Sequence, residues 1–291
     1  MDRATLLAFI GVVVLGGING VGIAILNTEV APLWGATLRF GSAAALLFGI
    51  VAARRIAMPR GRALAGSLAY GVLYFGVGFG LIHWALVQAP PGMSQVVLAV
   101  IPIIALLLAV LHGVERFRWQ GLVGAILALA GVSVVFGERL GGPLPTVSLL
   151  AILGGAFAIA EGTVAVKRLP GSHPVPGNAV AMAVGATLLL GASLVAREPW
   201  SLPDTVAAWG ALLYLVAVGS VVVFVLFLFV VMRWTASATS YVWPLLPLVA
   251  VPVSAVVLRE RVTPLLVVGG ALVAAGVYIG AFASPVRRPA R

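Results

Sequence analysis

The chain has 291 residues, of which 62% are hydrophobic and only 9% are charged, and its mean hydropathy is +1.17. About a quarter of the residues of a soluble domain are charged, so this composition excludes a water-facing surface and predicts one integral membrane domain. The absence of cysteine excludes disulfides and thiolate chemistry, and the net charge of +10 is explained by basic loops beside a membrane rather than by nucleic acid.

The apolar runs predict ten spanning helices, because each crossing of a bilayer takes about 20 apolar residues. The first run is too long for the core of a signal peptide and is expected to stay in the protein. Short connections leave no room for a soluble domain. In chain order the predicted helices are residues 4–26, 32–53, 63–88, 91–112, 118–137, 146–167, 175–197, 205–232, 235–258 and 263–283.

Arginine and lysine residues in the connections predict how the chain is oriented. Thirteen of them lie on the side of the membrane that would hold both termini, in the terminal segments or in the connections on that side. Four lie in connections on the opposite side. Because basic loops are retained in the cytoplasm, both termini are predicted to be cytoplasmic, in a multi-pass protein of the cell inner membrane. An even number of crossings gives the same result, since it places both termini on one side.

The chain matches itself at a spacing of 145 residues. The segment 102–131 recurs as 247–276, and a spacing of 143 relates residues 6–11 to 149–154. Each copy holds five predicted helices, and an odd number forces the second copy to insert upside down. The predicted fold is therefore all-α, with two inverted repeats, residues 4–137 and 146–283, around a central cavity. This arrangement is typical of secondary transporters.

These repeats resemble a known family. Residues Ala85, Leu86, Ala89, Gly92, Pro102, Glu115, Gly124 and Gly131 resemble the first EamA-type repeat of the drug/metabolite transporter superfamily, and Pro247, Glu260, Gly269 and Gly276 resemble the second. The resemblance spans essentially the whole chain and implies ten helices, a central cavity and export of small metabolites. Within the superfamily the chain most resembles the YddG-type aromatic amino acid exporters. Trp234 and Trp243 stand where the first copy has Ala89 and Leu98, which predicts a bulkier second half of the cavity.

Polar side chains inside the apolar runs are candidate site residues, because they are costly in hydrocarbon. Glu161 either titrates or binds a substrate ammonium group, or it is a locally paired carboxyl. Arg39 either binds a substrate carboxylate through its planar fork of donors or extends to the outer surface. Asn19 either lines the cavity or bonds a neighbouring helix, and His83 either changes charge near neutral pH or is a packed hydrogen-bonding group.

A proline-bearing face recurs in the two copies. Helical spacing places Ser94, Gln95 and Leu98 on one face leading to Pro102, and the repeat places Ser240 and Trp243 in the same relation to Pro247. A proline inside a helix frees a carbonyl, so Pro102, Pro244 and Pro247 mark either cavity-facing bends or hinges, or else ordinary packing kinks. Tyr74 is deep enough to reach the cavity, and Trp243 is the best candidate for stacking on an aromatic ligand.

The sequence predicts a transporter that exports small metabolites, chiefly amino acids with aromatic or other apolar side chains, by alternating access. Export of a drug, a nucleoside or another amino acid stays open, as does the choice between proton coupling and facilitated diffusion. An intramembrane enzyme is disfavoured because His83, His112 and His173 fall on different segments, and a sensing subunit because the loops are short. No cofactor or metal is expected. The expected partners are the substrate and the bilayer, with no nucleic acid, and one chain can enclose the cavity as a monomer.

Overall fold

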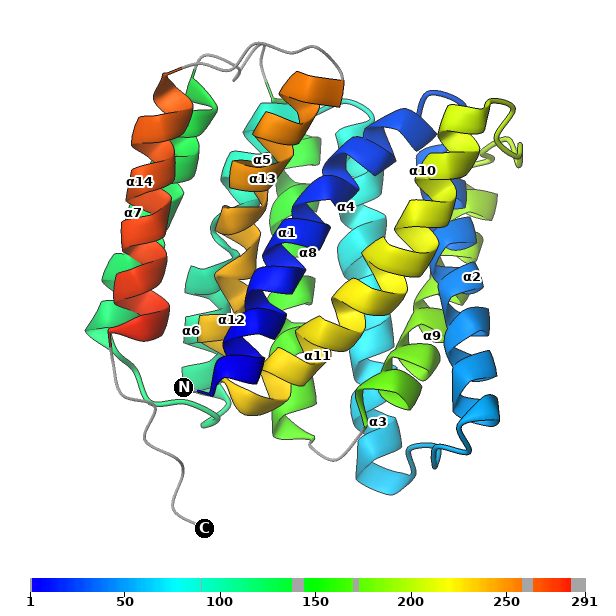
Figure 1. The fold of residues 1–291 in the computed structure, drawn as a ribbon, viewed down its shortest axis with the longest axis horizontal. Coiled ribbons are helices and arrows are strands. Elements are labelled where there is room, and N and C mark those ends of the chain that lie inside the picture. The colour runs from blue at the N-terminus through cyan, green and yellow to red at the C-terminus, as the bar shows by residue number, and fades with distance from the viewer. Residues whose placement is uncertain (1, 90, 138–143, 170–172, 258–263, 284–291) are drawn as a thin grey trace.

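Apolar helices run side by side through the molecule (Figure 1). The computed structural model describes residues 2–89, 91–137, 144–169, 173–257 and 264–283. Its first half contains α1 (Arg3–Leu26), α2 (Pro32–Ala53), a third helix made of α3 (Gly61–Tyr70), η1 (Gly71–Gly78) and α4 (Phe79–Leu86), a fourth made of α5 (Pro91–Leu98) and α6 (Ile101–Leu111), and α7 (Trp119–Val135). Its second half contains α8 (Thr146–Arg168), α9 (Pro174–Val195), an eighth helix made of α10 (Val206–Val216), η3 (Ala217–Val222) and α11 (Val223–Arg233), a ninth made of α12 (Ala236–Ser240) and α13 (Val242–Val257), and a tenth made of α14 (Leu265–Val277) and η4 (Tyr278–Phe282).

The helical content confirms the predicted all-α membrane fold. Within the described ranges nine helices are long and apolar enough to cross a membrane, and α7 is a shorter apolar helix of 17 residues. Those ranges contain no strand. Helix ends lie close to their predicted positions, as in the third helix, which runs from Gly61 to Leu86 where 63–88 is predicted. Glu260, one of the repeat residues, lies outside the described ranges.

Local sequence signals fix where several helices begin. The Asp2 carboxylate accepts hydrogen bonds from the backbone and the hydroxyl of Thr5, which caps α1. Pro32 and Pro174 stand at the first turns of α2 and α9, where a proline removes no helical hydrogen bond. The Thr205 and Thr235 hydroxyls cap α10 and α12. These caps satisfy backbone N–H groups that would otherwise be unpaired at the membrane surface.

The third and eighth helices each contain a widened π-helical segment. Residues 72–77 of η1 map onto all of η3, residues 217–222, at the 145-residue spacing of the repeat. Segments of this kind are frequent at functional sites. Among the prolines, Pro102 follows the interruption between α5 and α6, Pro244 lies in the first turn of α13, and Pro247 lies inside that helix.

Glycines allow α7 and α14 to pack backbone against backbone at one edge of the molecule (Figure 1). A Cβ atom on Gly276 would lie 2.5 Å from the Gly124 carbonyl oxygen, and one on Gly269 would lie 2.5 Å from the Gly131 carbonyl oxygen. Gly124 matches Gly269, and Gly131 matches Gly276, at the repeat spacing of 145. The matched residues therefore meet in reversed order, so the two helices run antiparallel.

Candidate functional site

A cavity lies between α1, the third and fourth helices, α11 and α13, with one contribution from α2. Its volume is about 140 Å³. By the same measure one water molecule needs about 10–15 Å³, so the cavity has room for a small molecule. The terminal face is the face of the molecule at which α1 begins and η4 ends (Figure 1). In α1 the lining residues extend from the middle of the helix toward its far end, and those in α4 and α5 lie in the halves of the third and fourth helices away from the terminal face. We call this space the central cavity.

One wall of the central cavity is polar and centres on a single backbone carbonyl. The oxygen of Gly219, in η3, accepts hydrogen bonds from the Asn19 side-chain nitrogen at 3.1 Å and from Arg39 Nη2 at 2.9 Å. Arg39 Nε also donates to the Ser220 hydroxyl at 2.7 Å. A Cβ atom on residue 219 would overlap the Asn19 side-chain oxygen, so glycine is needed for this close approach. Small residues in η3 therefore let α1 and α2 present their polar groups at one place.

The polar wall carries a charge without an acidic partner and two side-chain atoms without a hydrogen-bond partner among the described residues. Arg39 is 2% exposed, and its hydrogen bonds go to uncharged acceptors. Neither of these hydrogen bonds is to a carboxylate, so no acidic side chain among the described residues balances Arg39. The buried Asn19 Oδ1 and His83 Nδ1 atoms likewise have no hydrogen-bond partner in the described part of the chain. A buried charge and buried polar atoms are costly when unpaired, so a polar ligand would find complementary groups here.

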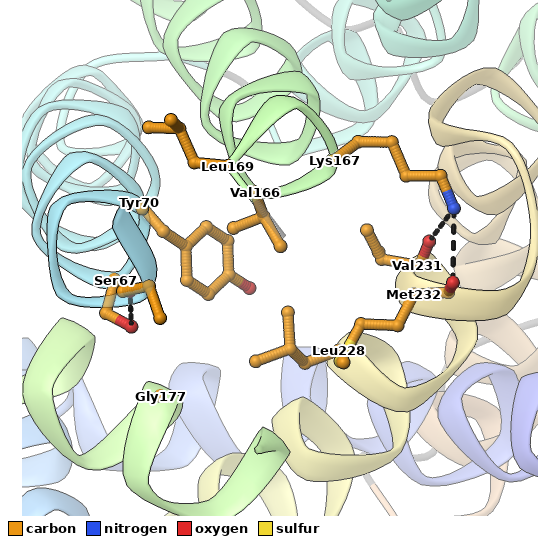
Figure 2. A pocket seen from close by; sticks show the side chains of 11 residues that line it. Ser67, Tyr70, Val166, Lys167, Leu169, Gly177, Leu228, Val231 and Met232 are labelled. Carbon is orange, nitrogen blue, oxygen red and sulfur yellow. Dashed lines mark hydrogen bonds between the residues drawn. The ribbon is translucent and has the colours of Figure 1, made fainter. Parts of the chain in front are cut away.

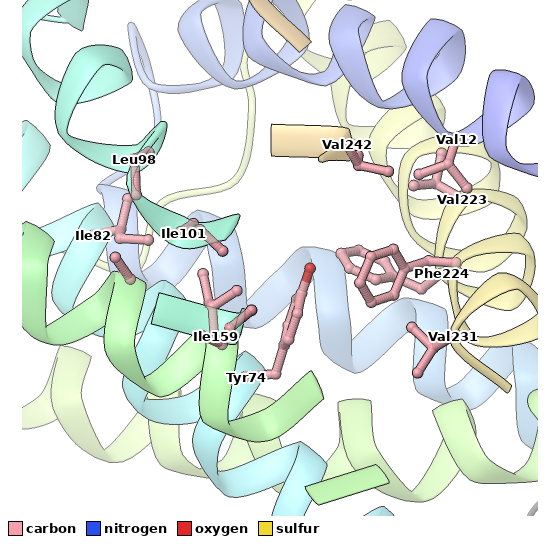
Figure 3. Close-up of a cluster of buried hydrophobic side chains, with 14 of the residues drawn as sticks. Val12, Tyr74, Ile82, Leu98, Ile101, Ile159, Val223, Phe224, Val231 and Val242 are labelled. Carbon is pink, nitrogen blue, oxygen red and sulfur yellow. The ribbon is translucent and has the colours of Figure 1, made fainter. Parts of the chain in front are cut away.

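The facing wall is aromatic. Tyr74 packs against Phe227 with ring centroids 5.6 Å apart and against the edge of Phe224 at 5.8 Å. Phe79 connects this group to Trp243, at a centroid separation of 6.5 Å. Figure 3 shows the Tyr74 hydroxyl and Phe224 directed toward the same space from different helices. Such rings suit the side chain of an apolar or aromatic ligand.

The polar and aromatic walls occupy matched places in the two halves of the chain. At the spacings of the repeat, Asn19 corresponds to Gly162 and Gly219 corresponds to Tyr74. Gly219 packs against Asn19, and a Cβ atom on Gly162 would lie 3.2 Å from Cβ of Tyr74. The same contact between helices is therefore made twice, once with a polar side chain and once with an aromatic one. Arg39 similarly corresponds to the buried, apolar Met182.

The central cavity brings together most of the predicted site residues. Those that line it are Asn19, Arg39, Tyr74, His83, Gln95, Leu98, Trp243 and Pro247. Ser94, Ser240, Pro102, Pro244 and Glu161 are not among its lining residues. Ser240 donates to the carbonyl of Ala236 one turn earlier.

Glu161 lies in a second polar group near the terminal face. Its carboxylate oxygens lie 2.9 and 3.1 Å from His112 Nε2. Arg168 Nη1 lies 3.3 Å from the other ring nitrogen of His112, Nδ1. This placement matches the locally paired carboxyl that the sequence left open. The described residues contain no cluster of three His, Asp or Glu side chains that could hold a metal.

Sequence reasoning missed the residues that complete the two walls. Ser220 is the only serine or threonine between positions 206 and 233, and that isolation in an apolar run was a usable signal. Phe79, Phe224 and Phe227 gave no such signal, because lipid accommodates an apolar ring as readily as the protein interior does.

Comparison with known proteins places this geometry in context. The model of the EamA-like transporter family matches residues 3–137 and again residues 146–281. The chain is 30% identical over 266 residues to a probable terminal-alkyne amino-acid exporter of Streptantibioticus cattleyicolor, covering 90% of this chain and 85% of that one. It is 27% identical over 293 residues to a probable amino-acid metabolite efflux pump of Salmonella typhimurium LT2, with 96% and 95% covered.

Two further matches agree with these. The inner membrane transporter YedA of Escherichia coli K12 is 28% identical over 226 residues, which cover 76% of this chain and 72% of that one. A solved crystal structure superposes with a TM-score of 0.83 at 19% identity, over 97% of this chain and 99% of the other. At that identity the superposition shows the shared fold alone.

Proposed function

Because this chain belongs to the EamA-like transporter family, we propose that it is an inner-membrane exporter of amino acids with aromatic or other large apolar side chains. Family membership makes it a transporter rather than an enzyme. The amino-acid substrate is supported by two relatives whose names describe amino-acid export. The inner membrane is supported by the name of YedA.

The observation that carries the substrate proposal is the buried Arg39 guanidinium, which has no acidic partner among the described residues and faces an aromatic wall. A substrate carboxylate pairs with the remaining N–H groups of Arg39, since guanidinium binds carboxylates through paired donors. The unpartnered Asn19 Oδ1 accepts from the substrate ammonium group. Trp243 and Phe79 contact the apolar side chain. A zwitterion with one apolar end complements both walls at once.

Two features of the packing support transport by alternating access. The reversed glycine contacts of α7 and α14 support two halves of opposite orientation, which interconvert between states open to either side. Toward the terminal face, the central cavity is closed by Tyr74 and Phe227. Beyond them Phe9 and Trp234 pack with ring centroids 5.0 Å apart. We propose that this side opens in the alternate state, with the terminal face in the cytoplasm and one chain forming the whole path.

The test is transport by the purified full chain in proteoliposomes. Radiolabelled L-phenylalanine is expected to exchange, and L-tryptophan and L-leucine to compete better than L-lysine, L-glutamate or a nucleoside. Replacing Arg39 by methionine removes a charge-assisted interaction of about 1.5–3 kcal/mol, which lowers kcat/KM by about 10–100-fold. Arg233→Met is the matched control, because Arg233 lies over the Phe229 ring and does not line the central cavity. Exchange of a nucleoside or drug without competition by any amino acid would refute the substrate class.

A further inference from the structure

A second pocket lies at the terminal face, outside the central cavity. It is formed where α3, α8, α9 and α11 meet, and its volume is about 140 Å³. Figure 2 shows it, and its lining includes Ser67, Tyr70, Val166, Lys167, Leu228 and Met232. We call it the terminal pocket.

The terminal pocket contains a buried hydroxyl that has no hydrogen-bond partner among the described residues. Tyr70 is 1% exposed, and its hydroxyl has no hydrogen-bond partner in the described residues. Figure 2 shows this hydroxyl directed into the pocket, toward Leu228. A buried hydroxyl without a partner is costly, and because such groups are few in native proteins, each calls for an explanation such as a functional role or a bound water or ion. Its orientation therefore indicates an acceptor that occupies the pocket.

The same pocket holds a positive charge. Lys167 Nζ donates to the carbonyl oxygens of Val231 at 2.9 Å and Met232 at 3.2 Å, near the end of α11. An ammonium group has three N–H donors, so these two bonds leave one donor and the charge. Leu228, Val166 and Met232 supply apolar surface around them. The pocket thus offers a cation, a hydroxyl donor and an apolar wall, which complement a carboxylate with an apolar side chain.

One layer of side chains separates the terminal pocket from the central cavity. Tyr70 lines the first and Tyr74 the second, and their ring centroids are 4.9 Å apart. On the opposite helix, Leu228 lines the terminal pocket and the preceding Phe227 lines the central cavity. The two spaces therefore lie in sequence along the third and eighth helices, next to the widened segment η1.

We propose that the terminal pocket is a second binding site for the transported amino acid, occupied before it reaches the central cavity. Tyr70 and Lys167 hold its carboxylate, and Leu228 and Met232 contact its side chain. This inference rests on the proposed function. It adds that the two faces of the protein bind the substrate through different residues.

The experiment measures the KM for L-phenylalanine separately at each face in proteoliposomes. Because the chain lacks cysteine, an Ala4→Cys substitution with an impermeant maleimide reports which way each molecule is inserted. Tyr70→Phe, which removes one hydrogen-bonding group, is expected to raise KM at the terminal face about tenfold and to leave KM at the opposite face unchanged. Lys167→Met should act on the same face. Tyr278→Phe is the control, since Tyr278 is exposed on the outside of the tenth helix.

Thermal unfolding separates ligand binding from a structural role. The Tyr70 hydroxyl bonds nothing in the described chain, so Tyr70→Phe should not lower the melting temperature of the substrate-free protein. An equal change of KM at both faces, no change at either face, or a lowered melting temperature would overturn the second site while leaving the proposed function intact. A wild-type protein that moves no amino acid of the panel would instead overturn the proposed function.

Discussion

Asn19 and Arg39 donate hydrogen bonds to one acceptor, the carbonyl oxygen of Gly219. The two side chains come from α1 and α2, and the acceptor lies in the π-helical segment of the eighth helix. This shared acceptor fixes both groups relative to the central cavity without giving either of them an ionic partner. A binding site benefits from that arrangement, because groups held in position lose less entropy when the substrate arrives.

Replacing Gly219 by alanine tests this arrangement. The new methyl group would overlap the Asn19 side-chain oxygen, which lies at the end of a flexible side chain and can move away. We therefore expect the protein to fold with Asn19 displaced, and kcat/KM for L-phenylalanine to fall about tenfold, the effect of about one lost hydrogen bond. Efflux from proteoliposomes measures the change.

Gly210→Ala is the matched control, because nothing lies within 4 Å of a Cβ atom built at that position of the same helix. It should leave efflux unchanged. Full activity of Gly219→Ala would show that the position of Asn19 is unimportant for transport.

Trp243 is expected to select for large apolar side chains. It lines the central cavity beside Phe79, with 6.5 Å between ring centroids. Trp243→Ala removes a stacking contact of about 0.5–1.5 kcal/mol beyond the apolar area it buries, so KM should rise about tenfold for L-tryptophan and much less for L-alanine. Trp119→Ala, at a position with 69% exposure, is the control for loss of an indole. Equal losses for both amino acids would assign Trp243 a structural role.

Most of the polar side chains that line the central cavity could be predicted from the sequence, because polar groups inside a membrane helix are rare and costly. Asn19, Arg39, His83 and Gln95 interrupt apolar runs, and each lines the central cavity. The same reasoning does not place Glu161, since a carboxylate in an apolar run is tolerated wherever a partner such as His112 is present. Spacing along one chain cannot reveal a partner that comes from another helix.

The phenylalanines of the aromatic wall, Phe79, Phe224 and Phe227, could not be predicted, for a different reason. Burial in a membrane protein does not follow from hydrophobicity, because lipid accepts apolar side chains as readily as the interior does. Phe224 is buried beside the cavity, whereas Phe157 and Phe48 are exposed on the outside of their helices. Only the packing of the helices separates these phenylalanines into two groups.

The stability of the fold should depend on the close glycine packing of α7 against the tenth helix. A Cβ atom on Gly124 would meet the backbone nitrogen of Gly280 at 2.5 Å, and backbone cannot move aside as a side chain can. Overpacking of this kind costs about 1–3 kcal/mol, so Gly124→Ala should lower the melting temperature of the purified protein by several degrees. Gly191→Ala, where a Cβ atom meets nothing within 4 Å, should be neutral or stabilising. Equal melting temperatures for the two variants would contradict the close packing.

The hydrogen bonds of Glu29 should make the stability of the folded protein depend on pH. Glu29 lies in the connection between α1 and α2, and it accepts hydrogen bonds from the Thr205 hydroxyl at 2.5 Å, the Thr205 backbone at 3.1 Å and the Asp204 backbone at 2.7 Å. The Thr205 hydroxyl, followed by the two backbone N–H groups, lowers the pKa of Glu29 from its ordinary value of 4.5. Hydrogen bonds to a carboxylate favour its charged form.

The lowered pKa of Glu29 means that acidification should destabilise the folded protein. Because the pKa is lower in the folded chain than in the unfolded chain, the stabilisation is fully present above pH 4.5 and is lost as the pH falls through the folded value. Melting temperatures measured across this window should therefore fall with acidification in the wild type and fall less in Glu29→Gln, which lacks the titrating group. Asp204→Asn is a suitable comparison, because Asp204 contacts Glu29 through its backbone N–H and not through its side chain. The same pH profile for Glu29→Gln and the wild type would show that the contact between Glu29 and the start of α10 does not stabilise the fold.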